Sequence, residues 1–255
     1  MGLYFSYFLD DSIQFNKYGW NRDSLDYRDE YIDYTPLLDA DNLDLRYTMP
    51  GIYNQQNIGS SVANAVAAAY EYNQIQLDEN HIFIPSRLFI YYNTRKIEKT
   101  VMYDAGAQIR NSIKSINIDG ICSETKWNYN PDNLNIKPAD ECYIHVPRIK
   151  YYRIHQDIKS LKGCLSNGVP FIFGFSVYDN FEKITKDNNT LSPPNKADQY
   201  LGGHCGLCVG YNDFDETFII RNSFGLEWGN NGHFNMKYEY MLNANLCSDL
   251  WIIKF

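Results

Sequence analysis

The feature that most constrains this chain is the junction between a polar loop and an alanine-rich helix near residue 60. Residues 55–59 read Gln-Gln-Asn-Ile-Gly, and residues 65–71 read Ala-Val-Ala-Ala-Ala-Tyr-Glu, the strongest helix-forming run in the chain. Ser60 and Ser61 stand between them, where the unpaired N–H groups and the positive dipole end of a helix favour an anion. Such a position suits a nucleophile or an oxyanion donor. Taken alone, however, the pattern favours an ordinary N-cap serine.

The composition predicts a folded globule and argues against several classes of partner. At 255 residues, with 44% hydrophobic and 16% aromatic residues, the chain is long enough for one large domain or two lobes. A formal net charge of −8 without a block of Lys or Arg argues against binding to nucleic acid or to an anionic membrane. No apolar run is long enough to span a bilayer. The short apolar start at residues 1–11 lacks the basic region of a signal peptide.

The order of patterns along the chain predicts an α+β fold with segregated lobes. Residues 1–45 are polar with single aromatics and no clean period, so we expect an extended arm that lies against the rest of the molecule. Residues 46–145 carry mainly helix signals, among them Ser86 as the cap of a helix that begins at Arg87. Residues 146–255 carry mainly strand signals. The expected strands are 151–154, 169–177, 205–211, 217–222, 233–237 and 250–254, with one short helix over 158–165.

The six cysteines predict buried thiols rather than a metal or redox site. Cys205 and Cys208 have CxxC spacing, but they lie in an expected strand, where residues three apart face opposite sides of the sheet. We therefore expect buried free thiols at these two positions. An even number of cysteines permits disulfides, although a chain of this length does not need them.

One histidine of the five stands in a distinctive setting. His204 follows two glycines at the start of an expected strand, and Asn222 ends the next strand. Neighbouring strands can bring the two together, so that the Asn222 carbonyl accepts the imidazole N–H and fixes its tautomer. Phe224 and Trp228 could shield this bond from water. The alternative is a surface histidine and a turn-forming asparagine, and for a lone histidine it is the preferred interpretation.

Four groups of residues, taken together and in order, resemble the papain-like cysteine peptidases. They are Gly-Trp at 19–20 with Asp-Tyr-Arg-Asp at 26–29, the run 54–65, Gly-Gly-His-Cys at 202–205 with Val-Gly-Tyr at 209–211, and Arg-Asn-Ser-Phe-Gly at 221–225 with Trp-Gly at 228–229. The most similar branch is that of bacteria and large viruses. The resemblance implies the papain and cathepsin fold, which has a helical lobe, an antiparallel β-barrel-like lobe and an active-site cleft between them.

The resemblance also implies a role for each residue that matches the catalytic motifs. Ser61 falls on the position of the nucleophile, His204 on the general base and acid, and Asn222 on the residue that orients the imidazole. Gln55 matches the side-chain donor of the oxyanion hole, with the Ser61 N–H as the second donor.

A peptide or protein substrate is implied as well, without metal or cofactor. The positions expected to contact substrate are Ala105, Gly106, Gly203, Trp228 and Asp249, with Gly106 preferred over Ala105 as the backbone partner. Asp249 would line the pocket for the second residue before the scissile bond and favour a basic side chain there. Residues 1–45 resemble a pro-segment that lies in the cleft as an intramolecular inhibitor. Endopeptidase action is the default expectation.

The chain departs from the family most sharply at Ser61, where the family has cysteine. A helix N-terminus and an imidazolium can lower a thiol pKa from ~8.5 by several units, whereas a serine hydroxyl in the same setting stays protonated. Asn222 also carries no charge to stabilise an imidazolium, unlike the carboxylate of serine hydrolases. We therefore predict very slow peptide hydrolysis or none.

Gln56 and Phe224 are milder departures from the family, replacing Gly and Trp. Ile58 replaces a disulfide cysteine of many secreted members, which favours a reducing compartment or reflects a disulfide-poor habit of this branch. Without a clear signal peptide, a cytoplasmic or virion-associated protein is expected rather than a secreted one.

Three explanations of Ser61 stay open. In the first, which the intact remainder of the site favours, a natural cysteine was replaced to trap an uncleaved precursor. In the second, Ser61 is natural and the protein is a non-catalytic peptide-binding relative. The third is a true serine nucleophile. The enzyme hypothesis rests on the joint presence of Gln55, His204 and Asn222, and the binding hypothesis rests on Ser61 alone.

Overall fold

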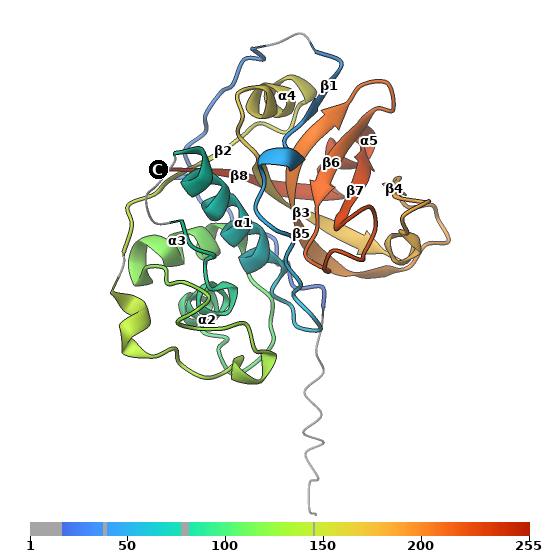
Figure 1. The fold of residues 1–255 in the computed structure, drawn as a ribbon. Helices are drawn as coiled ribbons and strands as arrows, with labels where there is room; N and C mark the ends of the chain where they lie inside the picture. Colours follow the sequence, from blue (N-terminus) through green and yellow to red (C-terminus); the bar gives the residue numbers. More distant parts are fainter. Residues whose placement is uncertain (1–16, 38–39, 78–81, 145) are drawn as a thin grey trace, which may run out of the picture.

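The computed structural model describes residues 17–37, 40–77, 82–144 and 146–255. In these ranges the chain forms a helical part and a β-rich part, with helix α1 (Ser61–Gln76) running between them (Figure 1). This is the two-lobed α+β arrangement that the sequence predicted. His81, His145 and the apolar start at residues 1–11 lie outside the described residues.

The other elements appear largely in the predicted order. The helices are α2 (Arg87–Glu98), α3 (Ile109–Asp119), α4 (Ile158–Ser166) and α5 (Tyr238–Met241). The strands are β1 (Asn42–Asp44), β2 (Lys150–Arg153), β3 (Phe171–Tyr178), β4 (Thr190–Leu191), β5 (Tyr200–Asn212), β6 (Thr217–Arg221), β7 (His233–Lys237) and β8 (Cys247–Lys254). Short 3-10 turns lie at Arg46–Thr48, Pro131–Asn133, Asp140–Tyr143 and Phe181–Lys183. The predicted cap of α2 is confirmed, because the Ser86 hydroxyl accepts a hydrogen bond from Phe89 N at 3.2 Å.

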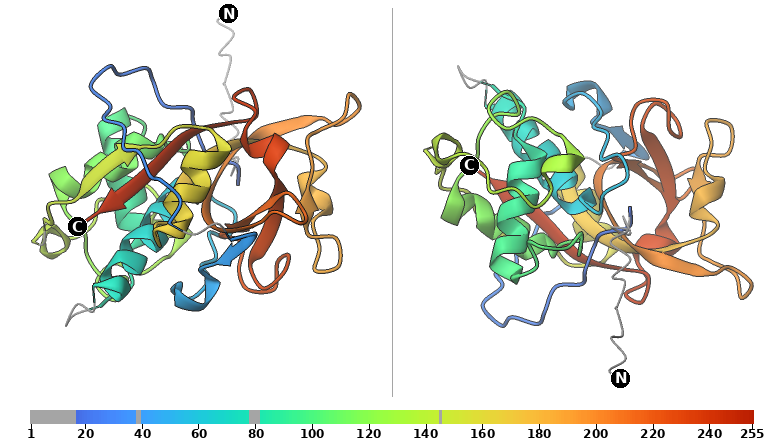
Figure 2. Two further views of the ribbon diagram at one scale, coloured as in Figure 1. Left: turned by 90° about the horizontal axis from the view of Figure 1, so that it is seen from above. Right: turned by 90° about the horizontal axis from the view of Figure 1, so that it is seen from below.

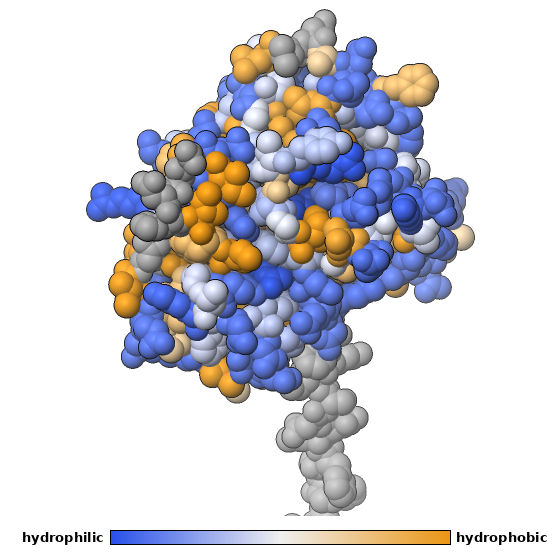
Figure 3. Space-filling view, in the orientation of Figure 1, coloured by the Kyte–Doolittle hydropathy of each residue, from blue (hydrophilic) through white to orange (hydrophobic). Residues whose placement is uncertain are grey.

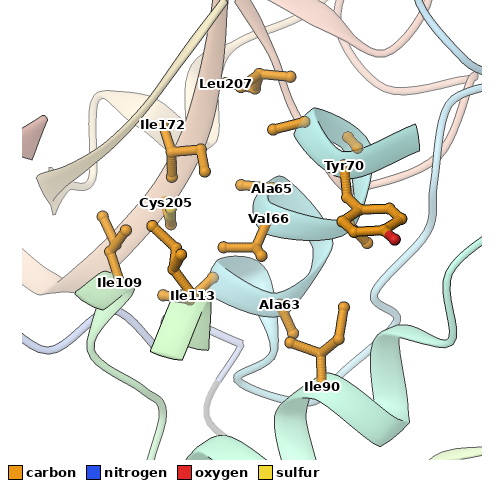
Figure 4. Packing of buried hydrophobic residues seen from close by; sticks show 14 of the residues in the cluster. Ala63, Ala65, Val66, Tyr70, Ile90, Ile109, Ile113, Ile172, Cys205 and Leu207 are labelled. Carbon is orange, nitrogen blue, oxygen red and sulfur yellow. The ribbon is translucent and has the colours of Figure 1, made fainter. Parts of the chain in front are cut away.

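Helix α1 is the central element of the core. Every residue from Ser61 to Tyr72 is buried, so the helix is enclosed on all sides instead of presenting one polar face. Its alanines let neighbouring elements approach closely. Figure 4 shows Ala63 and Val66 of α1 directed towards Ile90 of α2 and Ile113 of α3.

The strands form one curled sheet in the order β2-β8-β3-β5-β6-β7-β4, with β1 paired to β5. The pairs are antiparallel except for β4 with β7. Seen along the vertical axis of Figure 1, the strands of the β lobe curve around their own aromatic interior (Figure 2). Strand β5 separates the two cores, since Cys205 packs towards α1 whereas Cys208 packs into the β lobe. The prediction that the CxxC cysteines face opposite sides is confirmed, and all six cysteines are free thiols.

The arm crosses between the lobes. Its backbone bonds to the helical lobe through Ala107 N–H to Gly19 O (2.7 Å) and to β5 through Trp20 N–H to Gly203 O (2.8 Å). The surface in Figure 3 is largely hydrophilic, with apolar side chains in separate patches. Within the described part of the chain, no helix combines the length and apolar character needed to cross a membrane.

Candidate active site

Ser61 is the first residue of α1, at the positive end of the helix dipole. Ser60 holds the N-cap position, but its side chain does not cap the helix. Instead its hydroxyl lies 2.6 Å from the Tyr129 hydroxyl and accepts a hydrogen bond from Asn64 Nδ2 (3.0 Å). The Ser61 hydroxyl is fully buried and has no hydrogen-bond partner among the described residues. A buried hydroxyl without a partner is uncommon, and a catalytic role is one recognised explanation.

The structure brings His204 and Asn222 together as the sequence predicted. His204 Nε2 lies 2.7 Å from Asn222 Oδ1. A carbonyl oxygen only accepts hydrogen bonds, so Nε2 carries the proton and Nδ1 carries the lone pair. Nδ1 has no partner within the described residues. The imidazole is therefore fixed by one nitrogen and free to act as a base through the other.

Burial keeps this imidazole neutral. Desolvation lowers the pKa of His204 to about 4, the bond to Asn222 opposes this shift, and the Lys17 ammonium adds to it. Four aromatic rings stand within 6 Å of the imidazole centroid: Phe224 at 4.9 Å, Phe175 at 5.4 Å, Phe181 at 5.8 Å and Tyr18 of the arm at 5.9 Å. Trp228 packs on Phe224 (5.5 Å). Phe224 thus covers the His204 ring and Trp228 supports Phe224 from behind.

The Gln55 side-chain amide points towards the arm and is fixed at both ends by hydrogen bonds. Its amide Nε2 donates to Lys17 O of the arm at 2.8 Å and to Ile58 O at 2.9 Å. The opposite end of the amide is fixed, because Oε1 accepts a hydrogen bond from the Ser223 hydroxyl at 2.6 Å. The Gln55 side chain therefore presents its N–H group to a backbone carbonyl of the arm.

Gly19 of the arm lies between the two halves of the site. It is pressed against the backbone of Gly59, two residues before Ser61, since a Cβ on Gly19 would lie 1.8 Å from Gly59 O. It also pairs in parallel with Gly203, the neighbour of His204. The start of α1 and the histidine strand therefore flank the same short stretch of arm.

The predicted substrate-contact residues of the helical lobe all touch the arm. Ala105 O accepts a hydrogen bond from Asn21 Nδ2 at 2.8 Å. The backbone pairing itself comes from Ala107, which donates to Gly19 O and accepts from Asn21 N at 2.9 Å. Gly106 provides close approach, because a Cβ there would lie 2.2 Å from Gly19 O. The sequence preferred Gly106 as the backbone partner, and the structure assigns the hydrogen bonds to its neighbour.

Trp20 fills a recess between two glycines of the β lobe. A Cβ on Gly174 of β3 would lie 1.9 Å from Trp20 Cε2, and a Cβ on Gly203 would lie 2.8 Å from Trp20 Cε3. Real Cβ atoms do not approach other heavy atoms this closely, so any side chain at these two positions would displace the indole. The recess for the indole exists because Gly174 and Gly203 carry no side chains.

Asp249 is largely buried in an ion cluster, which borders a surface hollow beside the arm. Its Oδ2 accepts a hydrogen bond from Asp23 N (2.8 Å), and its Oδ1 lies 3.5 Å from Arg153 Nη2. Arg153 also bonds Asp29 at 2.8 Å, and Arg110 bonds Asp29 at 2.6 Å. Arg153 thus faces Asp249 while the arm is in place, and the preference for a basic substrate side chain stays a prediction.

Sequence reasoning missed the residues that hold the loop ahead of Ser61. The Asp104 carboxylate accepts a hydrogen bond from Gly59 N (2.9 Å) and another from the Tyr91 hydroxyl (2.6 Å). The Tyr91 hydroxyl in turn accepts from Gly106 N at 3.0 Å. Tyr129 donates to Gln55 O at 2.8 Å. These partners are far apart in the sequence and carry no local pattern. No cluster of His, Cys, Asp or Glu suited to a metal occurs in the described ranges.

A buried histidine–asparagine pair on the β lobe and the start of a buried central helix, with the same stretch of arm between them, is the arrangement expected of papain-type thiol proteases. The sequence pattern of the papain family of cysteine proteases matches residues 39–249, most of the chain. The chain therefore belongs to the papain family of cysteine proteases, as its motifs predicted.

Individual relatives agree with this placement. An uncharacterized peptidase C1-like protein of Acanthamoeba polyphaga mimivirus is 42% identical over 214 residues, covering 79% of this chain and 68% of that protein. The crystal structure of xylellain, a cysteine protease from Xylella fastidiosa, has a TM-score of 0.86 and 41% identity, covering 94% of this chain and 96% of that one. A digestive procathepsin L 3 of Tenebrio molitor shares the fold with a TM-score of 0.67 at 18% identity, over 89% of this chain and 75% of that one.

Proposed function

We propose that this chain is the precursor form of a papain-type endopeptidase, in which Ser61 occupies the nucleophile position and residues 17–23 block the cleft. The observation that carries the proposal is a pair of buried atoms without partners in the described structure. They are Ser61 Oγ at the start of α1 and His204 Nδ1 on β5. Both flank the stretch of arm around Gly19.

The proposed chemistry follows from these positions. The His204 Nδ1 lone pair takes the proton of the nucleophile at position 61, while Asn222 holds the Nε2–H. The nucleophile attacks the carbonyl carbon of a peptide, and Gln55 Nε2 stabilises the oxygen as it becomes negative. The imidazolium then gives its proton to the leaving amine. With a thiol the first step yields a stable thiolate–imidazolium pair, whereas the Ser61 hydroxyl is too weak an acid for that pair to form. We therefore infer that Ser61 leaves the chain with little or no peptidase activity.

The arm supports the precursor interpretation because it uses the groups that a substrate would use. Lys17 O accepts a hydrogen bond from Gln55 Nε2, the proposed oxyanion donor. Gly19 and Trp20 take up the backbone groups of Ala107 and Gly203 on the two sides of the cleft. A peptide substrate cannot reach position 61 while these contacts are made. The arm is thus an intramolecular inhibitor.

The alternative function is a natural, non-catalytic peptide-binding protein. It is favoured by one observation, which is the hydroxyl at Ser61 in a site that otherwise suits a thiolate. In that case the cleft would keep its affinity for extended peptides and would have no turnover.

One experiment separates the two functions. The Ser61→Cys variant of the full chain is assayed with fluorogenic peptides, and its N-terminus is followed by mass spectrometry. We expect kcat/KM to rise by at least about 10³-fold over the Ser61 chain, together with loss of the arm. Ser60→Cys is the matched control, because that side chain is held by Tyr129 and Asn64 and should restore nothing. An inactive Ser61→Cys chain, even after the arm has been cut away, would overturn the enzyme proposal.

A further inference from the structure

Cys122 and Cys142 form a small cluster apart from the two main cores. They pack with Phe89 of α2 on the helical lobe. They are the two cysteines of this cluster, and the Cys142 side chain is close enough to raise the pKa of the Cys122 thiol. The other four thiols have different partners: Cys164 donates to Val169 O (3.2 Å), Cys205 to Gly206 O (4.0 Å), Cys208 to Gly210 O (3.7 Å) and Cys247 to Met236 Sδ (4.0 Å).

The backbone holds both cysteines in place. Cys122 O accepts a hydrogen bond from Ser86 N at 2.8 Å, immediately before α2. Cys142 lies in a 3-10 turn, where its N–H donates to Ala139 O at 2.9 Å. The next residue, Tyr143, donates through its hydroxyl to Asn93 Oδ1 of α2 at 3.2 Å. Both cysteines are therefore anchored next to the same helix by hydrogen bonds of their own backbone or of the following residue.

The pair lies at the floor of a surface hollow, whose rim includes Ser123, Lys126 and Glu141. Cys122 is 5% exposed and Cys142 is 1% exposed. Lys126 is close enough to Cys122 to favour its thiolate, although burial and the neighbouring thiol raise the pKa of Cys122 overall. A small disulfide can thus reach Cys122, and the reaction should be slow at neutral pH.

We propose that Cys122 and Cys142 are a disulfide site, which oxidised glutathione or a similar low-molecular-weight disulfide converts to an intramolecular bond. The Cys122 thiolate attacks one sulfur of the oxidant, forms a mixed disulfide and releases one thiolate. Cys142, as a thiolate, then attacks the Cys122 sulfur of that mixed disulfide and expels the second thiolate. The protein loses two protons and two electrons, and the oxidant is reduced to two thiols. This inference does not rest on the proposed catalytic roles.

The disulfide would join the two ends of the segment 123–141, which lies beside α2, into a closed loop. That segment carries Tyr129, which donates to Gln55 O and lies 2.6 Å from the Ser60 hydroxyl. Cross-linking restricts the unfolded chain more than the folded one, so oxidation should raise the melting temperature by roughly 5–10 °C. The disulfide would thereby stabilise the support of the loop ahead of Ser61.

The test uses the full chain incubated with oxidised glutathione at pH 7 and pH 9. We expect a cross-linked Cys122–Cys142 peptide by non-reducing peptide mapping, faster formation at pH 9, and the stated rise in melting temperature, reversed by dithiothreitol. The Cys142→Ala variant should instead hold a glutathione adduct on Cys122. Cys164→Ala is the matched control and should still form the bond.

Three outcomes would overturn the proposal. They are no cross-linked peptide after prolonged oxidation, a bond between any other two cysteines, or a Cys122–Cys142 bond that leaves the melting temperature unchanged.

Discussion

The binding of the arm in its cleft should depend on two buried groups whose protonation has opposite effects. Burial under the arm lowers the pKa of His204 from 6.5 to about 4. Above pH 6.5 His204 is neutral whether the arm is bound or released, and arm binding has its full strength. Binding weakens as the pH falls from 6.5 towards 4, because only the released state then binds a proton at His204. On the arm, desolvation and the Asp249 carboxylate raise the pKa of Asp23 from 3.8 to about 6. Below pH 3.8 Asp23 is protonated whether the arm is bound or released, and arm binding has its full strength. Binding weakens as the pH rises from 3.8 to 6, because the Asp23 carboxyl then ionises more readily in the released state.

These shifts give the size of each effect. Between pH 8 and pH 4.5, His204 alone would weaken arm binding roughly 80-fold and Asp23 alone would strengthen it roughly 30-fold. The value for His204 is an upper limit, because Phe175, Phe181 and Phe224 still cover the ring when the arm leaves. The two effects largely cancel in the unmodified chain. Removing the Asp23 titration should therefore expose the acid-driven release.

The perturbation is Asp23→Asn in the full chain. Arm opening is measured by hydrogen exchange of the Trp20, Asn21 and Ala107 amides, which donate the hydrogen bonds that join the arm to the cleft. Relative to the unmodified chain, protection of these amides should fall about 30-fold further between pH 8 and pH 4.5, which is the contribution of Asp23 alone. Any loss of packing or of the bond from Trp251 Nε1 (2.8 Å) would lower protection at every pH without changing this slope.

The control is Asp26→Asn on the same arm. Its bonds to Arg28 lower the pKa of the partly buried Asp26 carboxyl, so it stays ionised throughout the pH range. Its profile should run parallel to that of the unmodified chain. If Asp23→Asn also gives a parallel profile, Asp23 is ionised in the bound arm and the reasoning is refuted.

Two further substitutions test the recess and the oxyanion donor. Gly174→Val should displace the Trp20 indole and lower the exchange protection of the Trp20, Asn21 and Ala107 amides at least about 10-fold. The control is Gly51→Ala, whose new Cβ meets nothing within 4 Å and should leave protection unchanged. Equal protection in both variants would contradict the glycine argument. Gln55→Glu, made in the Ser61→Cys chain, replaces an N–H donor with an acceptor and should lower kcat about 10²–10³-fold. The control is Gln56→Glu in the same chain, which changes an exposed side chain and should have little effect. Similar losses in both variants would exclude a specific role for the Gln55 amide.

The sequence allowed prediction of those parts of the site that depend on local pattern. An alanine-rich run predicted a helix that begins near Ser61. Two neighbouring strands allowed the contact of His204 with Asn222, and the family resemblance implied it. The ion pair of Asp249 was not foreseen, because its partner Arg153 lies on β2 and a local pattern cannot pair residues of separate strands. Support of Gln55 by Tyr129 was missed for the same reason.

The glycines show a second limit of sequence reasoning. Gly203 was expected to contact substrate because it precedes His204 in a family motif. Gly174 lies within a run of strand residues and was expected only to continue the strand. Both are needed because the Trp20 ring stands where their side chains would be. A glycine that makes room for a distant side chain leaves no sign in its own neighbourhood, so its purpose is visible only when the arm is in place.

The arm does more than cover the nucleophile. A thiolate at position 61 would need an imidazolium beside it, and that imidazolium needs a histidine that can hold a proton near neutral pH. With the arm in place, Tyr18 helps to bury His204 and the Lys17 ammonium disfavours a second positive charge, so the imidazole stays neutral. In the precursor that we propose, the arm would therefore prevent both substrate entry and formation of the ion pair. A cysteine at position 61 would be held as a thiol until the arm is released, which keeps a precursor inert even towards small reagents that enter the cleft.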